Sequence, residues 1–527
     1  MASRFSSHLV PVFVLTLLLV IQAAAAIATT SGTFDETLYL AMALRAYREG
    51  NVLPFVALGV APLPIFLCYF LPAIRSASVL VSPDSYAYLI TLARVSAVTL
   101  VGVPLVLLVY MWLTPRCDRL TSFMAAAMIA LSPNVVAHAS VATTDACFTL
   151  TALIALGVLA IYLERPSALL LIVLAVSMGL AFAAKYTAVM LLPTAFAAVV
   201  SWPRTPQDAI VSRLTRAVGV SVVLLAGAFV VPWAFHGFAI TRAEIGTWPV
   251  ISVPAPIASF LVQLEHNRVG HPAFLLGDLS PVGWWYYMPV ALLLKSTPAE
   301  LFVFGLAVIA YLTRWGNDTA AMRVLRLAFF ICGSALIFSY VNIGVRYALL
   351  LYPLAVLGAS RFATIAAAST RGRAAMAMLV LAQASSAVMI APHYLSYFNR
   401  LSGGPANGYR YLADSNVDWG QDLPALKRSL ETVGARRPLI AYFGTAPLEA
   451  YGIDALPWSC GRKLEAGSAD WVVISATYLD GVYVPDDTFA GFREIPPSAR
   501  AGYSMLLYAT DRADVRDALT ALSKTCI

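Results

Sequence analysis

The sequence predicts a polytopic α-helical membrane protein of about eleven transmembrane helices, with interfacial helices in the outer loops and a small soluble α/β domain at the C-terminus. The chain of 527 residues is 60% hydrophobic and only 12% charged, with a mean hydropathy of +0.77. Soluble domains are about 45–50% apolar and 25% charged. Apolar stretches of about 20 residues recur, which is the length that crosses a bilayer. Glycine, asparagine and charged residues become frequent only after about residue 398.

A net charge of +7 could indicate a nucleic-acid partner. The basic residues, however, lie in short loops between apolar runs, where they act as topology signals for membrane insertion. The sequence therefore predicts no nucleic-acid partner. It predicts instead that membrane lipids surround most of the chain.

The predicted transmembrane segments lie at residues 9–27, 93–113, 121–137, 147–163, 168–184, 186–200, 217–235, 299–313, 327–341, 347–360 and 374–391. One set of loops between them is short and basic, and the positive-inside rule makes this set cytoplasmic. The other set includes two long segments with sparser positive charge, 28–92 and 236–298, which we expect outside. Eleven crossings from a cytoplasmic N-terminus then place the C-terminus outside. The basic loops contain Arg116, Arg119, Arg165, Arg204, Arg213, Arg216, Arg314, Arg323, Arg326, Arg361, Arg371 and Arg373.

The first apolar segment has two interpretations. It is a retained transmembrane helix, which we favour, or a secretory signal with a small-residue cleavage site at Ala23–Ala26. Both interpretations put Thr33 and the following residues outside the cytoplasm.

Two pieces of the long outer segments are too apolar to be linkers. Residues 55–74 are interrupted by three prolines, and residues 284–294 are rich in aromatic side chains. Both fit interfacial helices at the membrane surface. The alternative, in which 55–74 is a full span, would reverse the topology of everything that follows.

The chain is expected to divide into a transmembrane domain, residues 1–397, and a soluble extracytoplasmic α/β domain, residues 398–527. Strands are predicted at 438–443, 471–478 and 503–509, and helices at 421–433 and 512–524. Cys460 and Cys526 would lie in the same oxidising compartment, so a disulfide bond between them is one open alternative. No CxxC spacing predicts a structural zinc site.

Acidic residues follow two of the apolar segments. Asp35 and Glu36 come directly after the first, and Asp145 opens the fourth. Acidic residues are common in the first turn of a helix, where they face the positive end of its dipole. A carboxylate held at the membrane surface also meets the need of a general base for a hydroxyl acceptor.

Two cations stand at outer helix ends, where the positive-inside rule disfavours them. They are Lys185 and Arg346. Snorkelling toward lipid headgroups is one explanation, and binding of a lipid-linked phosphate is the other.

The stretch 393–423 joins the last span to the soluble domain and is rich in acidic and amide side chains. Its spacing lacks the central glycine and final glutamate of an EF-hand calcium loop. We therefore expect it to form turns and helix caps.

The strings FDETLYL, ATTDACFTL, GLAFAAKYTAVMLLP, YYMPVALLLKSTP and NIGVRYALLLYPLA occur in this order along the chain. Together they resemble glycosyltransferase family 39 and the aminoarabinose-transferase-like group, which have the GT-C fold. The tail HYLSYFNRLSGGPANGYRYLADSNVDWGQDL is similar to a bacterial subgroup of lipid-carrier-dependent glycosyltransferases. The resemblance covers residues 1–430.

The resemblance implies a hexosyl- or pentosyltransferase of the bacterial inner membrane. It would move one sugar from a polyprenyl-phosphate donor to a glycan, lipid or protein acceptor on the extracytoplasmic face, usually with inversion. Asp35 would be the base beside Glu36, Asp145 would orient the acceptor or assist, and Lys185, Arg346 and Lys295 would bind the donor phosphate.

Two other functions and one cofactor stay open at this stage. A transporter or flippase for a lipid-linked glycan would place charges inside the spans, and an envelope assembly factor would bind a partner through its soluble tail. No cofactor is required, although an acidic pair such as Asp35 and Glu36 can bind Mg²⁺ or Mn²⁺.

Overall fold

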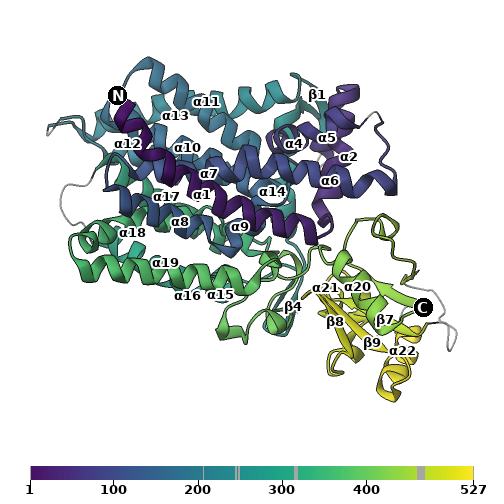
Figure 1. Ribbon diagram of the computed structural model, residues 1–527. Helices are drawn as coiled ribbons and strands as arrows, with labels where there is room; N and C mark the ends of the chain where they lie inside the picture. The colour runs from purple at the N-terminus through teal and green to yellow at the C-terminus, as the bar shows by residue number, and fades with distance from the viewer. Residues whose placement is uncertain are drawn as a thin grey trace.

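The computed structural model describes residues 2–76, 78–205, 207–243, 246, 250–313, 319–459 and 469–525. A helical bundle forms most of the molecule, and a small mixed sheet lies at one end of it (Figure 1). The α12–α13 and α18–α19 connections lie at the opposite end of the bundle from the sheet (Figure 1). The bundle therefore has two distinct ends.

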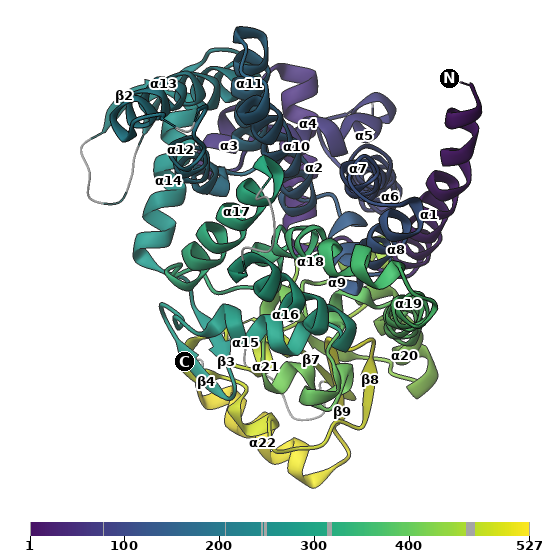
Figure 2. The same ribbon diagram turned by 90° about the vertical axis from the view of Figure 1, so that its left-hand side faces the viewer.

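Seven helices among the described residues are long and apolar enough to cross a membrane. α10 is the most buried of them and lies inside the bundle, whereas α1 lies at its edge (Figure 2). The second span is one helix interrupted by a π-helical turn, Val98–Gly102, and it begins ten residues before the predicted residue 93. The seven are α1 (Ala2–Thr29), α6–α7 (Pro83–Ala97 and Val103–Leu113), α10 (Thr144–Glu164), α13 (Ile210–Phe235), α17 (Ala320–Ile337), α18 (Leu351–Ala367) and α19 (Thr370–Ile390).

The remaining predicted spans are bent or short. The segment predicted at 121–137 is a pair, α8 (Arg119–Ala130) and α9 (Pro133–Ala139), which is bent by 66°. Ser132 is the N-cap of α9, and its side chain accepts a hydrogen bond from the backbone N–H of Val135. Pro133 is the first residue of the helix, a position that proline favours.

Three more spans are shorter apolar helices: α11 (Ala168–Ala184), η2–α12 (Tyr186–Met190 and Leu191–Ser201) and α16 (Pro298–Leu312). At about 1.5 Å per residue they are about 22–26 Å long, which is less than the ~30 Å hydrocarbon core. By length and composition the described part of the chain thus holds seven or eight full spans, fewer than the eleven predicted.

Glycine sets the spacing of α11 and α13. A Cβ atom at Gly227 would lie 2.1 Å from the carbonyl oxygen of Ala175, and one at Gly179 would lie 2.4 Å from that of Gly227. Small residues let membrane helices approach closely, which increases their packing contacts.

Within the first long segment, residues 34–75 form four helices of 16, 5, 7 and 6 residues. The stretch 55–74, predicted to be interfacial, is divided by the loop 58–61 and by a break at Tyr69 into pieces too short to span. The second outer segment contains two hairpins and two helices, one of which covers most of the predicted 284–294. The elements are α2 (Phe34–Glu49), α3 (Leu53–Ala57), α4 (Pro62–Cys68) and α5 (Phe70–Arg75), then β1 (Ile240–Ala243), β2 (Ile251–Pro254), α14 (Ala255–Val269), β3 (Ala273–Leu275), β4 (Asp278–Ser280) and α15 (Tyr287–Lys295).

The C-terminal sheet has the strand order β6-β5-β7-β9-β8. β5 pairs in parallel with β6 and β7, whereas β9 is antiparallel to both β7 and β8. The three predicted strands and two predicted helices of this region are all present. The bounds are α20 (Leu423–Val433), β5 (Pro438–Ala441), β6 (Leu456–Pro457), β7 (Trp471–Ser475), α21 (Ala476–Leu479), β8 (Ala499–Ala501), β9 (Met505–Ala509) and α22 (Ala513–Thr525). The disulfide considered between Cys460 and Cys526 lies outside the described residues.

The linker between bundle and sheet is folded onto the bundle. It consists of 3-10 turns at Tyr394–Ser396, Arg400–Ser402, Pro405–Arg410 and Asp414–Asn416. The backbone N–H groups of Ser31 and Phe34 donate to the carbonyl oxygens of Gln421 and Trp419, each at 2.8 Å. The linker is therefore part of the wall around the start of α2.

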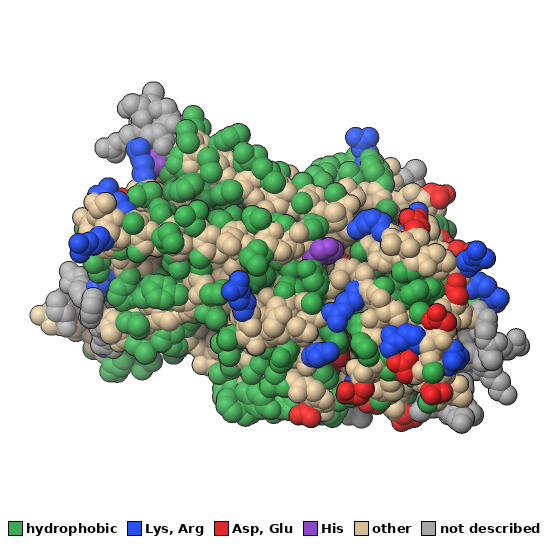
Figure 3. Space-filling model, turned by 60° about the horizontal axis from the view of Figure 1, so that its bottom comes forward, with side chains coloured by type: hydrophobic (Ala, Val, Ile, Leu, Met, Phe, Trp, Pro, Cys, Tyr) green, Lys and Arg blue, Asp and Glu red, His purple; other side chains and the backbone are tan. Residues whose placement is uncertain are grey.

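The surface is divided in the same way as the fold. Hydrophobic side chains cover most of the bundle, and charged side chains of both signs gather over the C-terminal region (Figure 3). Large exposed apolar residues lie on the outward faces of the spans, for example Val218, Val222 and Leu225 of α13. Such a belt indicates contact with lipid.

Candidate active site

A cavity of about 440 Å³ lies where the helix ends meet the two long outer segments. Its lining combines α2, the loop 58–61, the start of α10, the break after α11, α14, and the segment from α17 to Tyr347. Among the described residues that line the cavity, the Asp, Glu, Lys and Arg side chains are those of Asp35, Lys185 and Arg346. The cavity thus brings together residues that the sequence placed on separate helices.

Arg346 is the centre of this charged cluster. Its Nη1 atom lies 2.9 Å from Oδ2 of Asp35 and 3.6 Å from Oδ2 of Asp145. The second cation, Lys185, lies 2.5 Å from Oδ1 of Asp145. Asp35 and Arg346 are 311 positions apart in the sequence, so the fold alone creates this contact.

The local backbone structure positions each of the four charged side chains of the cluster. Asp35 and Asp145 occupy the first turns of α2 and α10. Lys185 is extended, with φ −164° and ψ 136°, and interrupts the path from α11 to η2. Arg346 lies on a short 3-10 turn, η3 (Val345–Ala348), whose first N–H, that of Val345, donates to Oδ1 of Asn416 at 3.0 Å.

Two aromatic rings complete the cluster. The guanidinium of Arg346 lies 4.2 Å from the centroid of Trp419, and the ammonium of Lys185 lies 3.9 Å from that of Tyr347. Cations are attracted to ring faces at these distances. Neither ring was predicted. Trp419 belongs to the unusual tail string, and Tyr347 directly follows Arg346, so the sequence contained a signal for both.

The cluster keeps unused hydrogen-bonding capacity. Nε of Arg346 and Oδ2 of Asp145 are buried and make no hydrogen bond. Asp35 is 22% exposed, whereas Asp145 is only 1% exposed. A buried donor without a partner is costly, so Arg346 is ready to receive an anionic ligand.

Glu36 lies apart from the cavity although it is adjacent to Asp35. Its carboxylate is fully buried and accepts hydrogen bonds from Arg94 at 2.7 and 2.9 Å, from the N–H of Ala142 at 2.8 Å and from the N–H of Thr33 at 2.8 Å. Burial raises the pKa of Glu36, but the charge and hydrogen bonds of Arg94 outweigh it and hold the pKa below its usual value. Glu36 thus fastens α2 to α6.

Arg94 was not among the predicted site residues. The predicted span began at residue 93, and a charged residue inside an apolar segment requires a partner. This requirement could have revealed the pair with Glu36 from the sequence.

Lys295 also lies away from the other cations. It is buried, donates to the carbonyl oxygen of Leu395 at 2.7 Å and to that of Asn416, and lies 4.5 Å from the centroid of Phe398. Burial lowers its pKa well below the usual value. Its contacts hold the linker against α15.

The polar residues of the tail string form turns and caps, as expected. Asp418 accepts from the N–H groups of Thr477 and Gly420, and Asp422 accepts from the hydroxyl of Ser504 at 2.9 Å. These contacts tie the linker to the sheet.

A divalent metal does not fit the cluster. Asp35 and Asp145 each already contact a cation, and in the described part of the chain no three His, Cys, Asp or Glu side chains are grouped to hold a metal ion. A metal would have to compete with Arg346 and Lys185 for the same carboxylates.

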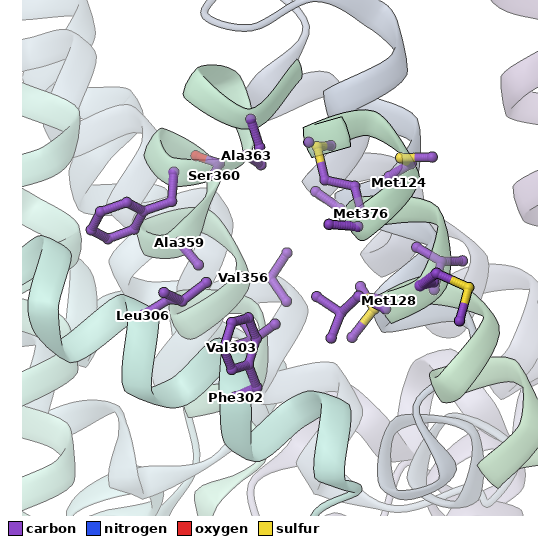
Figure 4. A pocket seen from close by; sticks show the side chains of 18 of the residues that line it. Met124, Met128, Phe302, Val303, Leu306, Val356, Ala359, Ser360, Ala363 and Met376 are labelled. Atoms are coloured by element: carbon purple, nitrogen blue, oxygen red, sulfur yellow. The ribbon is translucent and has the colours of Figure 1, made fainter. Parts of the chain in front are cut away.

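A second, larger cavity of about 610 Å³ lies between α8, α16, α18 and α19 (Figure 4). Its lining is apolar, with Met124, Met128 and Phe302 among the side chains, and Ser360 contributes a hydroxyl. No titratable Asp, Glu, His, Lys or Arg is among its described lining residues.

Residues 88–234 match the family described as dolichyl-phosphate-mannose-protein mannosyltransferase. Among curated proteins none matches the chain. The chain is also similar to the crystal structure of the Archaeoglobus fulgidus oligosaccharyltransferase tethered with an acceptor peptide, with a TM-score of 0.44 and 11% identity over 72% of this chain and 55% of that one. It thus spans little more than half of that protein.

The described part of the chain has the long apolar helices of an integral membrane protein, and residues 88–234 are similar to the dolichyl-phosphate-mannose-protein mannosyltransferase family. The matched segment includes Asp145 and Lys185 of the charged cluster. It also includes Arg94 of the ion pair that holds α2 against α6.

Proposed function

We propose that this protein transfers a sugar from a polyprenyl-phosphate donor to an acceptor on the extracytoplasmic face, with inversion at the anomeric carbon. The observation that carries the proposal is the contact of Asp35 with Arg346 in a cavity that also holds Lys185. A carboxylate beside two cations provides both a base for the acceptor and a site for the departing phosphate.

Arg346 and Lys185 bind the donor phosphate. When the acceptor oxygen attacks the anomeric carbon, the bond to the phosphate oxygen breaks and negative charge develops on the phosphate. Fixed cations stabilise that charge more in the transition state than in the ground state. The buried, unpartnered Nε of Arg346 supports this role, since arginine can offer two parallel N–H groups to a phosphate.

Asp35 accepts the proton of the attacking hydroxyl. It is the more exposed of the two carboxylates in the cluster, so an acceptor can reach it. Without a donor, Arg346 neutralises this base at 2.9 Å. A phosphate that competes for Arg346 would weaken this pair and free the Asp35 carboxylate to contact the acceptor hydroxyl.

Asp145 positions the cations and does not contact the acceptor. It is buried and lies within 3.6 Å of both Arg346 and Lys185. In this role it keeps two like charges close together before the phosphate arrives.

The polarity of the bundle supports the proposed sidedness. The α12–α13 and α18–α19 connections lie at the end opposite the sheet (Figure 1), and predicted cytoplasmic arginines lie in the first (Arg204) and directly after the second (Arg371 and Arg373). We assign residues 1–397 to the transmembrane catalytic domain and 398–527 to an extracytoplasmic domain, in a bacterial inner membrane. The acceptor is a glycan, a lipid or a protein.

The test is sugar release from radiolabelled polyprenyl-phosphate sugars by purified protein in detergent with native lipid extract. Turnover by the wild type and its loss in a folded Asp35→Asn variant would support the proposal. Asp84→Asn is a matched control, because Asp84 also lies in a first helical turn on an outer segment but is exposed and outside the cavity. If no donor turns over and Asp35→Asn behaves like the wild type in cells, the protein is not this transferase.

A further inference from the structure

The cavity extends from the charged cluster along α14, where its lining changes from charged to neutral polar. The ring of Phe260 lies 6.0 Å from that of Tyr186, the neighbour of Lys185. Farther along the chain, Gln263, His266 and Asn267 line the cavity, and His271 follows after the end of the helix. We call these last four residues the neutral arm.

Asn267 presents a fixed hydrogen-bond donor. Its Oδ1 atom accepts from the hydroxyl of Ser339 at 3.1 Å and from the N–H of Tyr340 at 3.3 Å. Because the amide oxygen is occupied in this way, the NH₂ group is the part of the side chain that remains for a ligand.

His271 presents a fixed acceptor. Its Nδ1 atom lies 3.1 Å from the carbonyl oxygen of Pro272 and 3.2 Å from the hydroxyl oxygen of Tyr483. That hydroxyl donates its own hydrogen to Asp414 at 2.5 Å, so both oxygens are acceptors toward His271. Nδ1 therefore carries the hydrogen, and Nε2 of the neutral ring carries the lone pair.

The backbone at this contact is held in an unfavourable conformation. Tyr483 has φ 62° and Asp414 has φ 55°, in the left-handed region that bulky residues rarely adopt. Such conformations persist where the surroundings fix them and often belong to binding sites. Tyr483 comes from the C-terminal domain, so that domain orients a residue of the cavity wall.

We infer that the neutral arm is a binding subsite for an uncharged sugar ring, whose hydroxyl groups bind to Asn267 and to Nε2 of His271. The inference rests on the proposed transferase function. A paired donor and acceptor suits a hydroxyl, which both accepts and donates a hydrogen bond. Burial lowers the pKa of His266, which favours the uncharged form of that ring.

The sugar ring has two sources in this reaction, the donor and a glycan acceptor. Both have the same chemistry, and either can lie beside the phosphate-binding cations. Saturation with a polyprenyl-phosphate sugar distinguishes these two sources. If the subsite holds the sugar of the donor, the donor displaces a free glycoside. If it holds the sugar of an acceptor, the glycoside binds together with the donor.

The test measures the binding of methyl glycosides to the full-length protein in nanodiscs by saturation-transfer NMR. The panel contains the neutral mannoside, galactoside and N-acetylglucosaminide and the anionic glucuronide. We expect at least one neutral glycoside to bind, and Asn267→Ala or His271→Ala to weaken its binding about tenfold, as expected for one lost hydrogen bond. Asn407→Ala, at an exposed amide outside the cavity, is the matched control and should bind like the wild type.

Tyr483→Phe tests the positioning role of the C-terminal domain. It should weaken the same glycoside about fivefold. The Tm of the unliganded protein should also fall, because the buried Asp414 loses a hydrogen-bond donor. In a His271→Ala background it should have no further effect on affinity, whereas a purely structural role would still be visible there.

Three results would overturn the inference: no neutral glycoside binds, the glucuronide binds best, or Asn267→Ala and His271→Ala bind like the wild type. Donor turnover is measured on the same preparation. If the wild type turns over donor but one of these results is found, only the subsite is wrong. If the wild type does not turn over any donor, the transferase proposal itself fails.

Discussion

Asp35 and Glu36 are adjacent on the first turn of α2, and each forms an ion pair with an arginine from a distant helix. Their surroundings differ. Glu36 is 0% exposed, and Arg94, Thr33 and Ala142 supply hydrogen bonds to both of its oxygens. Asp35 is 22% exposed, and its partner Arg346 keeps an unpartnered buried Nε.

The difference separates a structural ion pair from a reactive one. A buried pair with all its hydrogen bonds made has nothing left for a ligand, and loss of either partner leaves an isolated buried charge. A pair that is open to a cavity and incompletely bonded can exchange one partner for substrate. Two neighbouring acids in one motif thus have different roles because they face different surroundings.

Asp35→Asn should give the largest effect on activity. An amide keeps the shape of the side chain but cannot accept the proton of the acceptor, so turnover should fall about 10²–10⁴-fold. Donor turnover and thermal unfolding are measured on the same preparation. A large loss of stability with proportionate loss of activity would place Asp35 in the same structural class as Glu36.

Glu36→Gln should give the opposite pattern. Arg94 would remain as a buried charge without its counterion, and the free energy of unfolding should fall by about 3–5 kcal/mol. Chemical unfolding in detergent, followed by near-UV circular dichroism, measures this change. Glu49→Gln, at the exposed end of the same helix, is the control. A Glu36→Gln protein that is as stable as the wild type but inactive would contradict the comparison.

The two predicted phosphate-binding lysines extend the comparison to cations. Lys185 lines the cavity, so Lys185→Met should raise the donor KM about tenfold or more, the typical effect of a lost hydrogen bond from a charged group. Lys295 is buried against backbone carbonyl oxygens of the linker, so Lys295→Met should leave the donor KM within about twofold of the wild type. Equal KM values for both variants would remove Lys185 from the phosphate site.

The sequence was sufficient to predict which residue types lie at the outer helix ends. Asp35, Asp145, Lys185 and Arg346 were predicted because charges are costly at the edge of apolar segments, and the structure brings all four together. Glu36 carried the same signal but lies elsewhere, and Lys295, which only the family resemblance suggested, also lies away from the cluster. Which way a helix faces depends on tertiary packing, and the sequence around one residue does not contain that information.

The fold was predictable to a similar degree. Hydropathy located the apolar helices, including the break at Lys185, because each span must satisfy its own backbone hydrogen bonds. It placed the short helices α11, η2–α12 and α16 within one residue of their bounds, but it did not reveal the 66° bend between α8 and α9. The ring of Trp419 on Arg346 was also hidden, since it depends on how the linker folds back over the start of α2.

Asp418 is a third carboxylate and gives the smallest of the predicted effects. It is buried like Glu36 but has no cation among its hydrogen-bond donors, which are the N–H groups of Thr477 and Gly420. Burial raises its pKa to about 7. An aspartate in the unfolded chain has a pKa of about 3.9, so between these values the folded state binds more protons than the unfolded state, and stability falls as the pH rises.

We therefore expect the ionisation of Asp418 to lower the Tm of the wild type between about pH 5 and pH 7. Burial also raises the pKa values of Asp414 and Asp480, so these two groups add to the decrease. Asp418→Asn should remove the part of the slope that Asp418 contributes, because the amide does not titrate. The pair of Glu36 and Arg94 has the opposite sign: the pKa of Glu36 is lowered, so the stability that it contributes is lost only in acid, below about pH 4. A slope between pH 5 and 7 that is equally steep in Asp418→Asn would show that other groups account for it, and that burial without a cation does not distinguish Asp418 from Glu36.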